Sequence, residues 1–294
     1  MPRLTSNKLG LVAFLTLLTL VTTLRAQSPV DDALLKRSLL EGLTDIYDSG
    51  NFPAPAAIRR QLNRKNKYDG SFTIASPKVK IESAKRYENA RKATVVMGHL
   101  YLCDKCDNWH TTTAGGVIIS EDGLALTNHH VLAFERASIY GAMTSDGKVY
   151  AIEEVLAASK RDDVALVRIR TDEKLPFVSM ASSAPIGTPV FAVSHPDSHF
   201  YTLTKGYVSR YSVSPSLKIP RLEVTADFAR GSSGSGIFNE RGSLVGLIAS
   251  TKSIYYDQEN NIQTNLQMVI KSCVPLSGIN ALCSKFPSDY KSKD

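Results

Sequence analysis

The chain has 294 residues, 43% of them hydrophobic, which is enough for one large domain or two small ones with a real core. Its formal net charge of +7 is modest and, apart from a basic run at residues 59–67, scattered. No helix-turn-helix, zinc-finger or ribonucleoprotein-type aromatic motif accompanies that charge. We therefore expect no nucleic-acid partner and interpret residues 59–67 as the solvated face of a helix.

The first 26 residues differ in character from the rest of the chain. Arg3 and Lys8 precede an apolar stretch over residues 9–24, and the small Ala26 is followed by a polar segment. This pattern is typical of a secretory signal peptide. An uncleaved anchor is the alternative, although this stretch is short for spanning about 30 Å of hydrocarbon. We predict a signal peptide over residues 1–26, a periplasmic or extracellular protein, and no stable membrane insertion after cleavage.

Residues 27–92 form a leader with helical patterning. Leucine and isoleucine recur at helical spacing over residues 31–48, and a second short helix is predicted over residues 55–65 after a Gly/Pro-containing turn. The leader is compatible with a pro-segment, an oligomerisation arm or a packed extension. The sequence leaves these three possibilities and the oligomeric state open.

From residue 93 onwards, β-structure signals dominate. Short runs rich in Val, Ile, Tyr and Thr are separated by turns, and the Asp-Gly turns at residues 121–123 and 145–147 predict β-hairpins. No repeat of 20–50 residues is visible, which excludes solenoids and propellers. We predict an all-β domain over residues 93–285 that ends in a helix over residues 274–283, followed by a polar tail over residues 286–294.

The four cysteines form two pairs in the sequence. Cys103 and Cys106 make a Cys-x-x-Cys motif, and Cys273 and Cys283 lie ten residues apart. In an oxidising compartment disulfides form readily, and two local bridges are the simplest of the three connectivities. A zinc site that includes His110 is the more specific alternative, and free or redox-active thiols are a third possibility. We predict structural disulfides, no metal and no cofactor.

Three short motifs that carry chemistry occur in the order His, Asp, Ser. They are residues 127–131 (TNHHV), 162–166 (DDVAL) and 231–236 (GSSGSG). A serine hydroxyl is a poor nucleophile unless an imidazole accepts its proton, and the imidazole needs a carboxylate that fixes its tautomer. Taken singly, the motifs are compatible with a flexible loop, an interior histidine and a turn aspartate. Together they favour a hydrolase, but not an α/β-hydrolase, whose order is Ser, Asp, His.

The motifs resemble those of the trypsin-like (chymotrypsin-fold) serine peptidases, and within them the bacterial HtrA/Deg-like branch. The resemblance runs from about residue 93 to about residue 281 and includes residues 115–119 (GGVII), 124–128 (LALTN), 190–196 (VFAVSHP) and 244–248 (LVGLI). It implies two consecutive six-stranded antiparallel β-barrels with the active site between them. The chain ends about where HtrA-type proteins begin a PDZ domain, so none is expected.

The resemblance also implies the roles of individual residues. It matches His130, rather than His129, to the catalytic histidine, Asp163 to the catalytic aspartate and Ser233 to the nucleophile. The backbone N–H groups of Gly231 and Ser233 would form the oxyanion hole, and a side chain at Gly231 would obstruct the substrate carbonyl. The expected activity is hydrolysis of peptide bonds in protein or peptide substrates. A catalytically silent or latent binding module is the alternative.

The expected substrate pocket rests on weaker signals. Asp227 lies six residues before Ser233, the spacing at which trypsin-like enzymes place the base of the S1 pocket, and would there select Arg or Lys. HtrA-like enzymes carry a Thr-Asp pair with a structural role in the same stretch, which is the competing interpretation. The pocket wall is expected at Ala249, Ser250 and Thr251.

Overall fold

The structure is a computed structural model that describes residues 29–64, 66–74, 82–259 and 262–285. The predicted signal peptide and polar tail lie outside these residues. The helices are α1 (Asp32–Ser49), α2 (Pro55–Leu62), α3 (Ser83–Ala93) and α4 (Leu276–Asn280), with 3₁₀ turns η1 (His129–Leu132) and η2 (Pro196–Ser198). Within the described ranges, no helix combines the length and hydrophobicity required to cross a bilayer.

Most of the described chain is β-strand. The strands of the first half are β1 (Thr94–Leu102), β2 (Trp109–Thr111), β3 (Ala114–Ile118), β4 (Leu124–Thr127), β5 (Ile139–Met143), β6 (Val149–Ser159) and β7 (Val164–Ile169). Those of the second half are β8 (Pro189–Ser194), β9 (Thr202–Val213), β10 (Pro220–Val224), β11 (Gly236–Asn239), β12 (Leu244–Glu259) and β13 (Ile262–Pro275).

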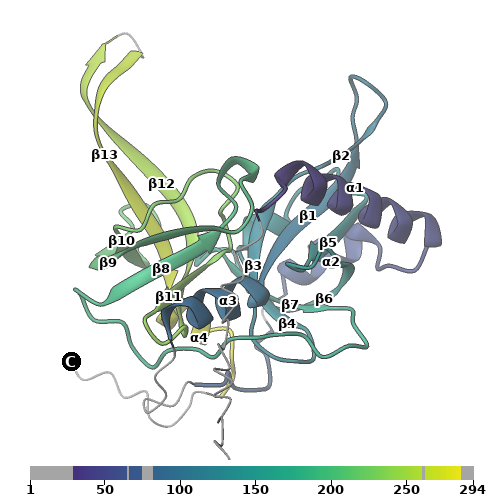
Figure 1. Cartoon of the computed structure of the whole chain (residues 1–294), viewed down its shortest axis with the longest axis horizontal. Helices are drawn as coiled ribbons and strands as arrows, with labels where there is room; N and C mark the ends of the chain where they lie inside the picture. The colour runs from purple at the N-terminus through teal and green to yellow at the C-terminus, as the bar shows by residue number, and fades with distance from the viewer. Residues whose placement is uncertain (1–28, 65, 75–81, 260–261, 286–294) are drawn as a thin grey trace, which may run out of the picture.

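The strands form two consecutive antiparallel barrels, as predicted. In the first, the order β1-β3-β4-β7-β6-β5 closes through pairing of β5 with β1, and β2 is added beside β1. The second closes in the order β10-β13-β12-β11-β8-β9. The two predicted hairpins are present, because β3 pairs with β4 and β5 pairs with β6. The barrels lie side by side, and the long β12–β13 hairpin extends beyond the second one (Figure 1).

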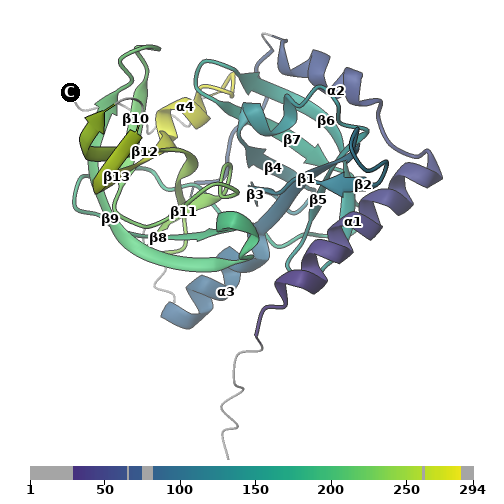
Figure 2. The ribbon, with the colours of Figure 1, turned by 90° about the horizontal axis from the view of Figure 1, so that it is seen from above.

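The first leader helix packs against the outside of the first barrel (Figure 2). Helix α1 buries Leu39 and Leu43. Opposite them lie Gly98 of β1 and Gly141 of β5, which are directly paired in the sheet. A Cβ atom would lie 3.2 Å from Leu39 if added to Gly98 and 2.3 Å from Leu43 if added to Gly141. The two glycines therefore make room for the leucines, and this leader helix is a packed part of the fold.

The rest of the leader contacts both barrels. Helix α2 buries Ile58 and Leu62 beside β6 and ends three residues earlier than predicted. Further on, the backbone N–H of Tyr68 donates to the Leu282 carbonyl at 2.8 Å, beside the second barrel. Helix α3 was not predicted, and it contacts β1 and β8.

The closing helix is shorter than predicted. Val274 and Pro275 still belong to β13, where they pair with β12, and α4 starts only at Leu276. The first two residues of the predicted helix therefore belong to a buried strand.

Candidate active site

The structure brings His130 and Asp163 into direct contact. His130 lies in η1 directly after β4, and Asp163 lies in the turn directly before β7. Because β4 and β7 are paired, with Thr127 opposite Ala165, the two turns meet at one end of the sheet. His130 Nδ1 lies 2.9 Å from Asp163 Oδ2 and 3.0 Å from Oδ1.

Backbone and side-chain hydrogen bonds fix the orientation of this pair. The His130 backbone N–H donates to Asp163 Oδ1 at 3.1 Å, and the Asn128 amide donates to the Asp163 carbonyl at 2.8 Å. An ionised carboxylate only accepts hydrogen bonds, so Nδ1 of a neutral His130 carries the proton and Nε2 is left as an acceptor. The His130 side chain is 52% exposed, so this acceptor is accessible from outside.

The neighbouring His129 and Asp162 are not part of this pair. His129 is buried, which lowers its pKa, and its Nε2 has no hydrogen-bond partner among the described residues. The Asp162 carboxylate accepts from the Ser159 hydroxyl at 2.6 Å. Each side chain therefore has a structural environment of its own, distinct from that of His130 and Asp163.

Ser233 lines the same pocket as His130. This pocket has a volume of about 370 Å³, and Gly231, Phe134 and Thr113 also line it. The Ser233 carbonyl accepts a hydrogen bond of 2.7 Å from the backbone N–H of Gly115 in β3, which ties this loop of the second barrel to the first. Among the described residues no hydrogen bond joins the Ser233 hydroxyl to His130. Such contacts are often looser in a protein without bound substrate.

The peptide between Arg230 and Gly231 is oriented by a backbone hydrogen bond. The Arg230 carbonyl accepts from the Asp197 backbone N–H at 2.7 Å. In a trans peptide the N–H points opposite to the carbonyl, so the Gly231 N–H points away from Asp197. Within the described part of the chain, the N–H groups of Gly231 and Ser233 donate to no protein acceptor. Both N–H groups are therefore available to an external oxygen atom.

The backbone of the second barrel gives an additional reason for glycine at position 231. Gly231 has φ +94°, a conformation that L side chains rarely adopt, and an added Cβ would lie 2.5 Å from the His195 carbonyl oxygen. A side chain at this position would therefore collide with the backbone of the supporting loop.

Asp227 lies in a different groove from Ser233. This larger groove, of about 1140 Å³, is lined by strands β9, β10, β12 and β13 and includes Ser250. Asp227 Oδ1 lies 2.7 Å from the ammonium of Lys271. The Lys271 side chain is only 10% exposed and that of Asp227 is 81% exposed. The carboxylate that was expected to select Arg or Lys is thus already paired with a cation.

The other expected pocket-wall residues lie together on one strand. Ala249, Ser250 and Thr251 belong to β12, where Ser250 pairs with Ser272 and Thr251 pairs with Lys271 of β13. Sequence reasoning did not single out Lys271, because this partner lies 44 residues from Asp227 and no motif marks it. It also missed Asn128, although this residue directly precedes the two histidines.

The cysteines do not form the predicted disulfides in this structure: all four are free thiols. Cys273 and Cys283 are buried and pack as small apolar side chains in the core. Burial raises the pKa of the Cys283 thiol to about 11 and raises that of Cys273 as well. The Cys106 sulfur lies 3.1 Å from His110 Nε2.

Comparison with known proteins finds a matching family and several relatives. Residues 114–247 match the family model of the trypsin-like peptidase domain. A probable periplasmic serine endoprotease DegP-like from Marinomonas sp. (strain MWYL1) is 32% identical over 141 residues, which are 47% of this chain and 29% of that protein. The serine endoprotease DegS of Escherichia coli (strain K12) is 30% identical over 159 residues, which are 52% of this chain and 42% of that protein. The chain thus spans less than half the length of these relatives.

Proposed function

Since residues 114–247 match the family model of the trypsin-like peptidase domain, we propose that the chain is a serine endopeptidase with His130, Asp163 and Ser233 as its catalytic residues. One observation carries the proposal. The His130–Asp163 pair leaves the second imidazole nitrogen free, and His130 lines the same pocket as Ser233. Two unpaired backbone N–H groups, at Gly231 and Ser233, support it further.

The proposed mechanism follows from these positions. His130 Nε2 accepts the Ser233 hydroxyl proton as the oxygen attacks the carbonyl carbon of a peptide bond. The N–H groups of Gly231 and Ser233 stabilise the negative oxygen of the tetrahedral intermediate, and in a comparable protease one such donor is worth about 2.7–4 kcal/mol. His130 then gives its proton to the leaving amine, and an acyl-enzyme remains on Ser233. Water activated by the same imidazole hydrolyses this ester, while Asp163 stays ionised and stabilises the imidazolium.

The charges around Ser233 and Asp227 argue against a preference for basic side chains at the P1 position of the substrate. The described residues that line the Ser233 pocket include Arg230 but no carboxylate. Asp227 lines the neighbouring groove, where Lys271 pairs with it. A positively charged P1 side chain would therefore compete with a resident ammonium group. We propose a substrate whose P1 residue is not basic.

Export is part of the proposal. The pattern of residues 1–26 favours a signal peptide. DegP-like relatives from Marinomonas sp. (strain MWYL1) and Hahella chejuensis (strain KCTC 2396) are named as probable periplasmic proteins, which supports export. Amino-terminal sequencing of the protein from its native host should find a start beyond the apolar stretch. A protein that begins at Met1 would contradict export through this segment.

The first experiment is labelling of the full chain with a fluorophosphonate probe, which reacts covalently with activated serines. We expect labelling of the wild type and none of Ser233→Ala or His130→Ala. Ser235→Ala is the matched control for the nucleophile, because Ser235 lies in the same loop and its buried hydroxyl has no hydrogen-bond partner in the described structure. Asp163→Asn should label at least about a hundredfold more slowly, since the amide favours the wrong tautomer of His130.

Two outcomes would decide against the proposal. Labelling that persists in Ser233→Ala would mean that another serine is the reactive one. A folded wild type that is neither labelled nor able to cleave unfolded protein substrates would favour the alternative, a silent or latent binding module. Circular dichroism of each variant separates loss of chemistry from loss of fold.

A further inference from the structure

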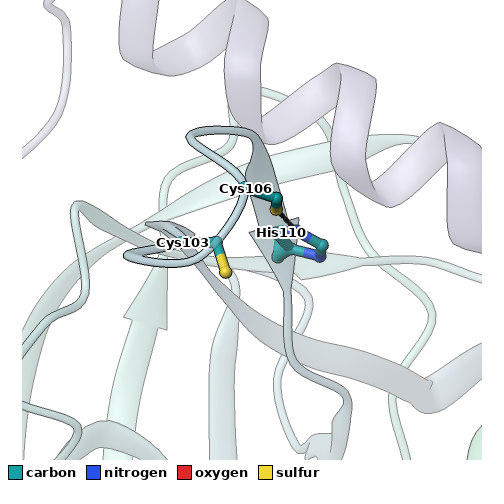
Figure 3. Close-up of side chains that lie close together, drawn as sticks. All are labelled: Cys103, Cys106 and His110. Carbon is teal, nitrogen blue, oxygen red and sulfur yellow. Dashed lines mark hydrogen bonds between the residues drawn. The ribbon is translucent and has the colours of Figure 1, made fainter.

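Two thiols and one imidazole meet at the tip of the β1–β2 hairpin, away from the proposed catalytic residues. Figure 3 shows Cys103, Cys106 and His110 grouped at this tip. Their possible ligand atoms, two sulfurs and one ring nitrogen, all lie within 4.8 Å of one another. Cys106 Sγ and His110 Nε2 are 3.1 Å apart. Cys103 is half-buried, and the other two side chains are exposed.

The backbone of the hairpin holds these three residues in place. Tyr101 pairs with His110, and the turn is closed by a hydrogen bond of 3.0 Å from the Cys103 N–H to the Asn108 carbonyl. The Asp107 N–H donates to the Cys103 carbonyl at 3.1 Å, and Asp107 itself has φ +51°. The Cys-x-x-Cys motif therefore forms a compact, hydrogen-bonded turn. His110 is the second residue of β2, the strand that follows this turn.

The same turn directs hydrogen-bond donors at one sulfur. The backbone N–H groups of Lys105 and Cys106 and the Cys106 thiol are the donors to the Cys103 sulfur. Metal ions bind the thiolate form of cysteine, and N–H donors of this kind stabilise the negative sulfur. The turn thus places backbone N–H donors around one of the two sulfurs.

The distances suit a tetrahedral ion. Zn–S bonds of about 2.3 Å and Zn–N bonds of about 2.0–2.1 Å place two sulfurs about 3.8 Å apart and a sulfur and a nitrogen about 3.6 Å apart. In the structure Cys106 Sγ and His110 Nε2 are 3.1 Å apart, and all three ligand atoms lie within 4.8 Å of one another. Shifts of about 1 Å would bring these atoms to the zinc-bound distances. Two thiolates and a neutral imidazole are ligands that zinc prefers, and two thiolates balance its charge.

We propose that Cys103, Cys106 and His110 bind one zinc ion, with a solvent molecule or a donor from outside the chain as the fourth ligand. Binding releases the protons of the two thiols to solvent and changes no oxidation state. The site is independent of the proposed peptidase chemistry, because Ser233 and His130 take no part in it.

The proposed zinc site is connected to the wall of the Ser233 pocket. The His110 ring stacks on Tyr101, with centroids 5.8 Å apart, and Tyr101 meets Phe134 edge-on at 5.7 Å. Phe134 lines the pocket. Arg136 forms an ion pair with Asp104 and lies over the Phe134 ring at 5.8 Å. A bound ion would therefore hold the hairpin tip against residues that shape the pocket.

The test measures metal directly in the full chain, without reference to activity. The protein is reduced with a phosphine, loaded with zinc, freed of excess metal by gel filtration and analysed by elemental mass spectrometry. We expect one zinc ion per chain in the wild type and a loss of affinity of more than about tenfold in Cys103→Ser, Cys106→Ser and His110→Ala. Cys283→Ala is the matched control, because it removes a buried thiol outside the cluster and should retain the ion.

Substitution with cobalt identifies the ligands. Wild type and Cys283→Ala should show intense tetrahedral ligand-field bands and a thiolate-to-cobalt charge-transfer band, which Cys103→Ser weakens. Zinc retained equally by wild type and by the three cluster variants would overturn the proposal. So would protein isolated with a Cys103–Cys106 disulfide that takes up no zinc after reduction. Because activity is not the readout, an inactive protein that binds zinc would refute only the peptidase.

Discussion

Acid should destabilise the protein through one buried histidine. The His195 ring is fully buried, and its Nδ1 accepts a hydrogen bond of 3.2 Å from the Tyr201 backbone N–H. A neutral ring with an acceptor at Nδ1 carries its proton on Nε2, which lies 3.3 Å from the Val95 carbonyl. Protonation would place an N–H of His195 against the N–H of Tyr201 and leave a buried charge.

The size of the effect follows from the pKa. Burial lowers the pKa of His195 from 6.5 to about 4. The folded state therefore favours the neutral ring, and its contribution to stability is complete above pH 6.5 and is lost as the pH falls towards 4. This pKa difference corresponds to about 3 kcal/mol once the pH lies well below both values, at about 1.4 kcal/mol for each pH unit. Burial also lowers the pKa of His99 to about 4, so a second group acts in the same range.

Urea unfolding measured between pH 7 and pH 4 tests this argument. Replacing His195 by Gln removes the titrating ring, so between pH 7 and pH 4 the free energy of unfolding should fall by a little under 3 kcal/mol less in the variant than in the wild type, on the order of the linkage energy. The variant is also less stable at pH 7 by about 1–3 kcal/mol because a hydrogen bond is lost, and the pH dependence is therefore the informative quantity. His199→Gln, at an exposed ring, is the matched control. Parallel pH profiles for wild type and His195→Gln would refute the reasoning.

Three further substitutions test other parts of the structure. Leu39→Ala should lower the free energy of unfolding by about 2–5 kcal/mol in urea titrations, because Leu39 is fully buried against the first barrel; an unchanged value would mean that α1 is dispensable. Gly231→Ala should reduce kcat/KM at least about a hundredfold, because its Cβ would collide with the loop that orients the oxyanion donor; wild-type rates of probe labelling would contradict this. Asp227→Ala should change kcat/KM for Arg and Lys at P1 by less than about fivefold in a peptide library, because Lys271 already pairs with this exposed carboxylate; a loss confined to basic P1 residues would restore Asp227 as a specificity residue.

Much of the fold could be predicted because local signals agree with the final structure. The leucine spacing predicted helix α1, and the Asp-Gly turns predicted two hairpins. Helix α3 was missed because its sequence is polar and it buries only Ala90 and Ala93, which give no apolar periodicity. The contact between His130 and Asp163 also depends on residues far apart in the sequence, because it requires the pairing of β4 with β7. The order of the motifs and a family resemblance, rather than local propensity, made those two residues predictable.

Contacts that depend on the docking of the two barrels could not be predicted from local sequence. The Gly115 N–H of the first barrel supports the Ser233 carbonyl of the second, and the Arg221 guanidinium of the second supports the Asp162 carbonyl of the first. Each hydrogen bond lies at, or next to, a proposed catalytic residue, since Asp163 directly follows Asp162. The geometry of the proposed active site is therefore a property of the interface between the barrels. A perturbation that loosens this interface should reduce catalysis before either barrel unfolds, because neither barrel alone contains both Ser233 and Asp163.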